Sequence, residues 1–238
     1  FYRIRKGKKI IKPKKTLTFA ENFFYMCFGK VPQKEIVKAF DVSLILYAEH
    51  SFNVSTFTAR TITSSLSDIH GAITGAIASL KGPLHGGANE EVMHMMNKIK
   101  KPENALKWIN KALDNKDVVM GFGHRVYKSG DSRVPTMREY FGKVAKIKKD
   151  KKFEKIYDIV EKVMIDRKNI HPNVDYPTGP TYHLMGFDTD FFTPIFVISR
   201  ITGWSAHIIE QHAANKLIRP LASYKGSRHR KVLQLNQR

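Results

Sequence analysis

Helical periodicity constrains this chain more than any other feature, because strand-like alternation of apolar and polar residues is almost absent from it. Between Ile36 and Tyr47, apolar side chains recur at intervals of three and four, which predicts a helix over 33–50. The same spacing predicts helices over 59–82, 89–100, 102–115, 134–149, 151–169 and 190–218. We expect an interruption of the last helix at Gly203. The pattern as a whole predicts an all-α fold.

The stretch 59–82 carries small residues at helical spacing, including Ala72, Gly75 and Ala76. Small side chains let a second backbone approach closely, so we expect this helix to be buried and to end at Gly82-Pro83. The breaks between the predicted helices hold most of the chemically reactive residue types, at 83–87, 117–133, 171–181 and 186–189. Loops held between rigid helices are a common place for functional side chains.

The composition is that of a globular protein, with 42% hydrophobic residues in a chain of 238. A single cysteine, Cys27, excludes an internal disulfide framework and favours a reducing, cytoplasmic location. No uncharged apolar run is long enough to span a membrane. The chain opens FYRIRKGKK, without an initiator methionine or a signal-peptide core, so we expect the natural N-terminus to lie upstream.

Forty-one Lys and Arg residues against twenty-one Asp and Glu residues give a formal charge of +20. Such an excess favours a polyanionic partner: nucleic acid, an anionic membrane or a phosphorylated small molecule. Residues 1–15 and 225–238 contain no acidic residue at all. Because no zinc motif or aromatic-interleaved motif accompanies these lysines, we interpret them as solvated surface rather than as a nucleic-acid site.

Four polar clusters lie at or between the predicted helices. They hold His50 and Asn53 in "AEHSFNVST", His85 in "GPLHGGANEE", His124 in "GFGHRVYKSGDSR" and Asp175 in "HPNVDYPTGP", a loop with three prolines. Taken singly, each has an ordinary structural explanation, such as a hydrogen-bonded histidine or a turn-forming aspartate. The glycines and basic residues of the third cluster are compatible with either a phosphate cradle or a catalytic histidine.

In combination, the clusters suit chemistry at a carbon next to a carbonyl group. A carboxylate removes the proton, one imidazole hydrogen-bonds the enolate oxygen, and a second imidazole polarises another carbonyl. Arg133, Arg200 and Arg219 are able to clamp a small dicarboxylate by bidentate hydrogen bonds. The run "HIIEQH" lacks the spacing of the zinc-binding HExxH motif, so we predict no metal site.

These motifs resemble the citrate synthase family. The stretch "GFGHRVYKSGDSR" fits the family signature, "GPLHGGANE" and "NVD" resemble its other two catalytic segments, and "SRITGWSAHIIEQ" resembles its C-terminal helices. The resemblance runs over nearly the whole chain in the same order. "GDSRVPTM", with Ser132 where many members have proline, and "DYPTGPTYHLMGFD" are more similar to the family's 2-methylcitrate synthase branch.

The resemblance implies a role for each matching residue. Asp175 corresponds to the base that takes the α-proton of an acyl-CoA, His85 to the residue that stabilises the enol, and His124 to the residue that polarises and protonates the oxaloacetate carbonyl. The implied oxaloacetate ligands are His50, Asn53, Arg133, Arg200 and Arg219, the last supplied by the partner subunit. The implied coenzyme A contacts are Met120, Gly121, Phe122, Gly123, Lys128 and Asn173.

The family's fold and activity follow from the resemblance as expectations. The fold is a helical homodimer, with a large domain here over 1–86 and 188–238 and a small domain over 87–187. The reaction joins propanoyl-CoA, oxaloacetate and water into 2-methylcitrate and CoA, with coenzyme A as a substrate and no permanently bound cofactor. Acetyl-CoA, as in citrate synthase, is the alternative donor. Polyanion binding and an inactive remnant are remoter alternatives.

The resemblance also bears on packing at the start of the chain. Family members carry further residues before the segment that begins this chain. Those residues supply helices to the large domain and to the dimer interface. We therefore expect much of the apolar face of 33–80 to lack its packing partner here.

Overall fold

A computed structural model describes residues 1–127 and 129–237. The described residues fold into helices and loops, with one isolated bridge between Phe122 and Pro172 in place of any strand. The all-α prediction is therefore confirmed. The helices in chain order are α1 (Tyr2–Arg5), α2 (Phe19–Phe28), α3 (Lys34–Ala48), α4 (Val54–Ser64), α5 (Ile69–Leu80), α6 (Ala88–Ile99), α7 (Pro102–Asp114), α8 (Val134–Lys148), α9 (Lys152–Lys168), α10 (Asp175–Met185), η1 (Thr189–Phe191), α11 (Phe192–Ala213) and η2 (Leu235–Gln237).

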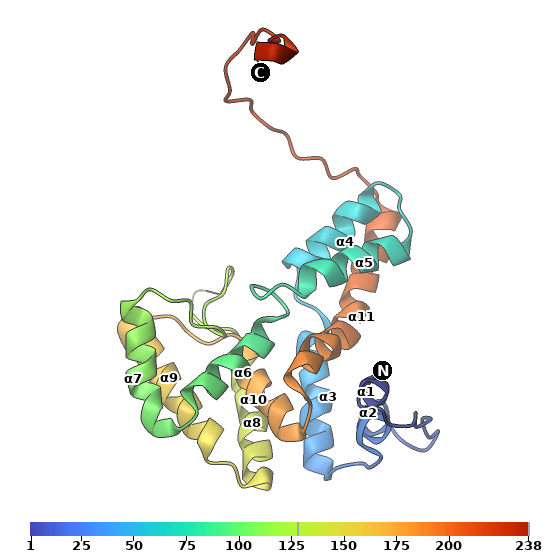
Figure 1. The fold of residues 1–238 in the computed structure, drawn as a ribbon. Coiled ribbons are helices and arrows are strands. Elements are labelled where there is room, and N and C mark those ends of the chain that lie inside the picture. The colour runs from blue at the N-terminus through green and yellow to red at the C-terminus, as the bar shows by residue number, and fades with distance from the viewer. Residues whose placement is uncertain (128, 238) are drawn as a thin grey trace.

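The long helix α11 connects the two halves of the molecule (Figure 1). Its first half packs against α3 in the lower body, where α8 and α10 also pair, and α6, α7 and α9 lie to one side. Its second half packs against α4 and α5, which pair with each other. We call α4, α5 and the second half of α11 the arm. Beyond Ala213, Asn215 and Ile218 still hydrogen-bond to Ser64 of α4, and the chain then runs away from the body as an extended tail.

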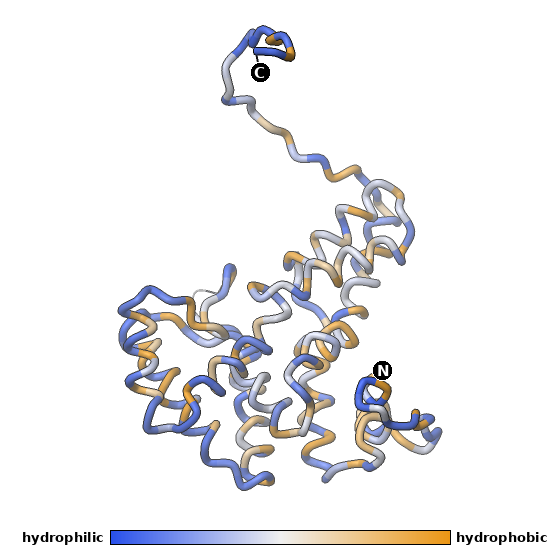
Figure 2. Tube along the Cα trace, viewed as in Figure 1, coloured by the Kyte–Doolittle hydropathy of each residue, from blue (hydrophilic) through white to orange (hydrophobic). Residues whose placement is uncertain are grey.

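The helices bury one face each, as their amphipathic sequences predict, and Figure 2 shows the resulting alternation of apolar and polar residues along the tube. Phe24 of α2 and Phe40 of α3 lie edge to face with ring centroids 5.2 Å apart, and both rings contact Phe187. Full burial of one such side chain contributes about 1.5–3 kcal/mol. A Thr18–Glu21 capping box begins α2, a helix that the apolar spacing did not predict.

The prediction of one continuous helix over 59–82 is wrong. The structure has two antiparallel helices, α4 and α5, separated by a turn in which Leu66 has a left-handed φ of 64°. Asp68 begins α5, because its side chain accepts a hydrogen bond from the Gly71 amide at 2.9 Å. The prediction that the whole stretch is buried is also wrong in part, since Leu66 is 72% exposed and Ile69 is 41% exposed.

The predicted interruption at Gly203 is wrong as well, because α11 runs unbroken through that position and ends at Ala213 rather than at residue 218. The glycine is needed for packing instead. A Cβ atom at residue 203 would lie 2.4 Å from the carbonyl oxygen of Ala48, so only glycine allows α11 to cross the end of α3 this closely. Tertiary packing, rather than a local break, accounts for this residue.

Asp175 was expected in a proline-rich loop over 171–181, and this expectation is wrong. Asp175 is the first residue of α10, which continues through Pro177 and Pro180 to Met185. Pro177 lies in the first turn, where the amide has no intrahelical acceptor, whereas Pro180 lies inside the helix and leaves the Tyr176 carbonyl without its usual i+4 donor. The carboxylate therefore stands at a helix N-terminus, where the positive end of the helix dipole favours negative charge.

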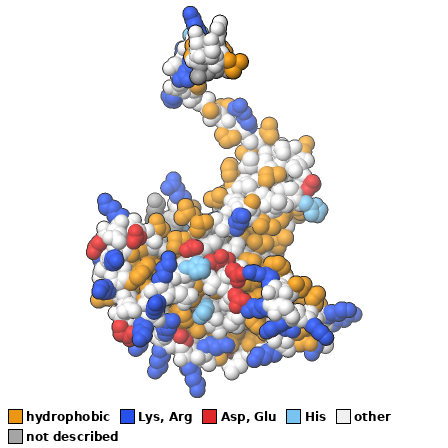
Figure 3. All heavy atoms as spheres, in the orientation of Figure 1, with side chains coloured by type: hydrophobic (Ala, Val, Ile, Leu, Met, Phe, Trp, Pro, Cys, Tyr) orange, Lys and Arg blue, Asp and Glu red, His pale blue; other side chains and the backbone are white. Residues whose placement is uncertain are grey.

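The arm exposes more apolar surface than its packing explains. Exposed apolar side chains gather on it in the space-filling view (Figure 3). Phe57 of α4, Leu66 of the turn, and Ile69 and Ile77 of α5 are all exposed. The expectation that much of the apolar face of 33–80 lacks a partner therefore agrees with the structure on α4 and α5, but not on α3, whose Ile36, Phe40 and Tyr47 are buried. Among the described helices, none combines the length and apolarity that crossing a membrane requires.

Candidate active site

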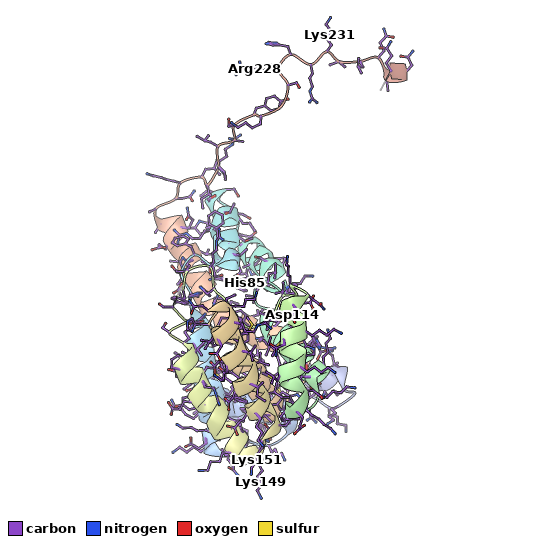
Figure 4. All side chains as sticks on the ribbon, turned by 90° about the vertical axis from the view of Figure 1, so that its left-hand side faces the viewer. His85, Asp114, Lys149, Lys151, Arg228 and Lys231 are labelled. Atoms are coloured by element: carbon purple, nitrogen blue, oxygen red, sulfur yellow. The ribbon has the colours of Figure 1, made fainter. Side chains whose placement is uncertain are left out.

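A cleft of about 760 Å³ lies where the loops between the helices meet. Loops after α3, α5 and α7 contribute to its walls, together with the start of α10 and the middle of α11. In Figure 4, His85 lies at the junction of arm and body, whereas Lys149 and Lys151 lie at the opposite end. The residues predicted from the sequence that line this cleft are His50, Asn53, His85, Gly123, His124, Arg133, Asn173, Asp175 and Arg200.

Asp175 is held by a buried tyrosine. The Tyr47 hydroxyl donates a hydrogen bond to Oδ1 of Asp175 at 2.5 Å, and Tyr47 itself is inaccessible to solvent. Burial raises the pKa of Asp175 to about 6, although the Tyr47 hydrogen bond and the nearby charge of Arg133 oppose that rise. A carboxylate with this pKa is ionised at neutral pH and is more basic than an ordinary aspartate, which suits it to proton abstraction.

His85 is oriented by the first turn of α4. Its Nε2 lies 2.8 Å from Oγ of Ser55 and 3.4 Å from the Ser55 amide, an N–H that needs an acceptor because Ser55 is buried. Accepting this N–H requires a lone pair on Nε2, so we assign the ring hydrogen of neutral His85 to Nδ1; the Ser55 hydroxyl hydrogen then points to Nε2 rather than to Oδ1 of Asn53, which is also 2.8 Å from Oγ. The indole N–H of Trp204 donates to Oγ of Ser55 at 3.1 Å. Burial lowers the pKa of His85 to about 4, so the ring is neutral at physiological pH.

His124 and His50 face each other, with their Nε2 atoms 2.9 Å apart. The amides of Val126 and Tyr127 both donate to Nδ1 of His124 at 3.1 Å. The hydrogen of neutral His124 is therefore on Nε2, which donates to His50 in the absence of a substrate. Burial lowers the pKa of both rings, that of His50 to about 4. The Tyr127 ring stacks on His124 at 4.5 Å.

Two arginines supply the positive charge. Arg133, at the start of α8, is paired with the buried Asp131, with 2.7 Å between Nη2 and Oδ2. Arg200 of α11 donates from Nε to the Tyr47 carbonyl at 2.6 Å, and its buried Nη1 has no hydrogen-bond partner among the described residues. A buried, unpaired guanidinium N–H is costly unless an anion accepts from it. Burial accordingly lowers the pKa of Arg200 to about 10.

Residues 121–123 are tied to residues 171–173 by backbone hydrogen bonds. The Gly123 amide donates to the His171 carbonyl, and the Asn173 amide donates to the Gly121 carbonyl, both at 2.9 Å. Gly121 has a φ of 85°, and a Cβ atom there would lie 2.9 Å from Cβ of Tyr176, so both conformation and space require glycine. The loop that carries His124 is thereby fixed to the segment that carries Asp175.

Some predicted site residues lie outside the cleft wall. Met120, Gly121 and Phe122 are behind it, where the Phe122 ring packs against Tyr176 at 4.4 Å. Arg219 lies on the exposed tail, and its side chain bonds only to the neighbouring Pro220 carbonyl among the described contacts. Lys128 lies outside the described residues. The described residues include no group of three or more His, Cys, Asp or Glu side chains that could hold a metal ion.

The sequence interpretation missed four side chains that hold the site together: Tyr47, Ser55, Asp131 and Trp204. Ser55 and Asp131 each lie two residues from a predicted site residue, so proximity in the sequence was an available signal. Tyr47 and Trp204 looked like apolar residues of helices, and nothing in the local pattern distinguishes them from core.

Comparison with known proteins identifies the family. The citrate synthase C-terminal domain family matches residues 1–221. The chain therefore belongs to the citrate synthase family, as its motifs predicted, and the all-helical fold agrees with this assignment.

Individual relatives narrow the comparison further. The chain is 55% identical over 241 residues to 2-methylcitrate synthase 2 of Corynebacterium glutamicum, covering 99% of this chain and 63% of the relative. It is 53% identical over 231 residues to a citrate synthase of Mycolicibacterium smegmatis, covering 97% of this chain and 62% of the relative. The chain thus spans about three fifths of the length of the curated relatives it matches.

A solved relative shares the fold closely. The citrate synthase of the archaeon Thermoplasma acidophilum, in a ternary complex with carboxymethyl coenzyme A and oxaloacetate, matches with a TM-score of 0.91 and 38% identity. The match covers 100% of this chain and 64% of that one.

Proposed function

We propose that this chain condenses an acyl-CoA with oxaloacetate, with propanoyl-CoA as the preferred donor, and so acts as a 2-methylcitrate synthase. The observation that carries the proposal is the convergence of His85, His124 and Asp175 on one cleft that Arg133 and Arg200 also line. The relative crystallised with oxaloacetate and a coenzyme A analogue supports the two substrates.

Each group has a defined proton position for this reaction. Asp175, ionised at neutral pH, accepts the α-proton of the thioester, while the Nδ1–H of His85 donates to the thioester oxygen as the enolate forms. The Nε2–H of His124 turns from His50 to the oxaloacetate carbonyl and makes its carbon electrophilic. The α-carbon attacks that carbon, and the new alkoxide receives the His124 proton. Water then cleaves the thioester and releases CoA.

The unpaired Nη1 of Arg200 and the exposed edge of Arg133 suit the two carboxylates of oxaloacetate. Asn53 and His50 lie on the same wall and complete the binding set. On the coenzyme A side, the backbone of 120–123, Asn173 and Lys128 remain the proposed contacts, and coenzyme A is a substrate rather than a bound cofactor.

The proposed acyl donor, propanoyl-CoA, has a close alternative in acetyl-CoA. A relative named citrate synthase is 53% identical, nearly as similar as the 55% identical 2-methylcitrate synthase, so acetyl-CoA is the second candidate. The two donors differ by one methylene, which a hydrophobic pocket discriminates by about 1–3 kcal/mol. We therefore expect both donors to react, with a higher kcat/KM for propanoyl-CoA.

The proposed assembly is a homodimer. The apolar side chains on the arm suit burial against a second copy, and Arg219, which lies outside its own cleft, is the proposed ligand of the partner's oxaloacetate. Within each copy, residues 87–187 form the proposed small domain, which closes over substrates bound against 1–86 and 188–238.

The two-donor assay tests the reaction. CoA release is measured with oxaloacetate and either propanoyl-CoA or acetyl-CoA, and the products are identified by mass spectrometry. A higher kcat/KM for acetyl-CoA would replace the donor, whereas absence of release with both donors would refute the reaction. Salt-dependent nucleic-acid binding that oxaloacetate does not affect would favour the polyanion alternative.

A further inference from the structure

Asp131 lies behind the cleft wall and has no proposed contact with either substrate. Its side chain is fully buried, yet each carboxylate oxygen accepts two N–H groups. Oδ1 accepts from the backbone amide and Nε of Arg133, both at 3.0 Å. Oδ2 accepts from Nη2 of Arg133 at 2.7 Å and from the Val174 amide at 3.0 Å. All four of these contacts are to just two residues.

Those two residues belong to different parts of the site. Arg133 is a proposed oxaloacetate ligand, and Val174 is the N-cap residue of α10, immediately before Asp175. The Asp131 carboxylate therefore links two parts of the site. One is the guanidinium of Arg133, the proposed ligand of oxaloacetate; the other is the backbone next to Asp175, the proposed base for the acyl-CoA. The two residues are 41 positions apart in the sequence, with helices α8 and α9 between them, so their proximity depends on tertiary contacts such as these.

We propose that Asp131 is a positioning residue that couples oxaloacetate binding at Arg133 to the placement of the base Asp175. The inference rests on the proposed function and adds to it a residue that the reaction needs although it has no proposed contact with either substrate. Burial alone would raise the pKa of Asp131, but the hydrogen bonds and charge of Arg133 outweigh burial and lower it. The coupling carboxylate is thus ionised throughout the neutral range.

Asp131→Asn breaks the coupling with little change of shape. An asparagine has one acceptor oxygen, so its NH₂ group must face either the Arg133 amide and Nε or Arg133 Nη2 and the Val174 amide. In the first orientation the NH₂ group opposes two donors of Arg133, and Arg133 keeps one of its three contacts; in the second, the contact with the Val174 amide is lost. Asp114→Asn is the matched control, because Asp114 also pairs with an arginine, Arg167, but on the exposed surface of α7 and outside the cleft lining.

Val174→Pro removes the other end of the link alone. Val174 has a φ of −58°, which proline adopts without strain; the substitution removes the N–H that Asp131 accepts and replaces the buried valine side chain by the proline ring. The Asp131–Arg133 pair is untouched. If Asp131→Asn fails to fold, this variant decides the question by itself.

The test combines hydrogen exchange with kinetics on the full-length protein. We expect oxaloacetate to slow amide exchange over 173–180 in the wild type and in Asp114→Asn. Asp131→Asn should lose this protection even when saturated with oxaloacetate, and its kcat should fall by about a hundredfold, as misplacing a catalytic group by an ångström does. Val174→Pro should lose kcat while its Kd for oxaloacetate stays within about twofold of the wild type, because Arg133 keeps its partner.

Other outcomes would overturn the coupling. A raised Kd for oxaloacetate with wild-type kcat and protection in Asp131→Asn would reduce Asp131 to a support for Arg133. Wild-type kcat in Val174→Pro would have the same meaning. Failure of the proposed function looks different: a wild type that binds oxaloacetate but releases no CoA refutes the reaction, while the exchange measurement still decides the role of Asp131.

Discussion

The cleft and the arm differ in whether a single chain supplies the contacts that their side chains need. In and behind the cleft wall, the carboxylates of Asp175 and Asp131 and the ring of His85 all have hydrogen-bond partners from the same chain. On the arm, Leu66 and Ile69 are 72% and 41% exposed, next to helices whose other faces are well buried. The machinery for proton transfer is therefore built within one copy, whereas the arm's surface is suited to a second one.

Asp175, the proposed base, gives the largest expected effect. Asp175→Asn should lower kcat by about 10²–10⁴-fold, because the amide cannot accept the α-proton. The asparagine oxygen still accepts the Tyr47 hydrogen bond, so we expect wild-type stability; alanine would instead leave that buried hydroxyl unpaired. Thermal unfolding and oxaloacetate binding serve as controls. A variant that keeps a tenth of wild-type turnover would exclude Asp175 as the base.

The arm gives the next effect, and it should arise through assembly. Ile69→Glu places a charge on the exposed first turn of α5, where the helix dipole tolerates an acid. We expect dissociation into monomers in sedimentation experiments. Loss of the partner's arginine should then lower kcat/KM for oxaloacetate about tenfold to a hundredfold.

Leu106→Glu is the matched control for the arm, since Leu106 is 54% exposed on α7, far from the arm. It should change neither assembly nor rate. If Ile69→Glu yields monomers with wild-type kcat/KM, the site is complete in one copy, and the proposed role of Arg219 is wrong.

The pH profile tests the cleft without a mutation. The ionised form of Asp175 is required, and its pKa is about 6, so kcat/KM should fall as the pH drops through this value, by about tenfold per pH unit below it. His50 and His85, each with a pKa near 4, stay neutral across that window and should not contribute a limb there. A profile that is flat down to pH 4.5 would contradict the buried environment assigned to Asp175.

The sequence predicted the polar side chains that line the cleft better than the residues that hold them in place. His85, His124 and Asp175 stand out because glycines and prolines flank them and because the family motifs contain them. Tyr47 and Trp204 do not, because their functional partners lie 128 and 149 residues away. Apolar spacing cannot report such contacts.

The fold shows the same division between local and distant causes. Helical spacing predicted the all-α class, and the N-cap Asp68 was a local signal for the missed break between α4 and α5. Gly203, in contrast, is explained by the distant Ala48 carbonyl, so its local reading as a helix breaker was wrong. Single-sequence patterns capture which faces are apolar, but they do not capture which helices cross closely.

Tyr47→Phe should give the smallest loss of activity, and that loss should be confined to low pH. The variant keeps the ring that packs 4.0 Å from Phe196 and removes only the hydroxyl that bonds to Asp175. That hydrogen bond lowers the pKa of Asp175, so its loss should move the acid limb of kcat/KM upward by about one pH unit. At pH 6 the variant should therefore be several-fold slower, and above pH 8 it should match the wild type. An equal loss at every pH would mean that Tyr47 places the carboxylate rather than setting its basicity.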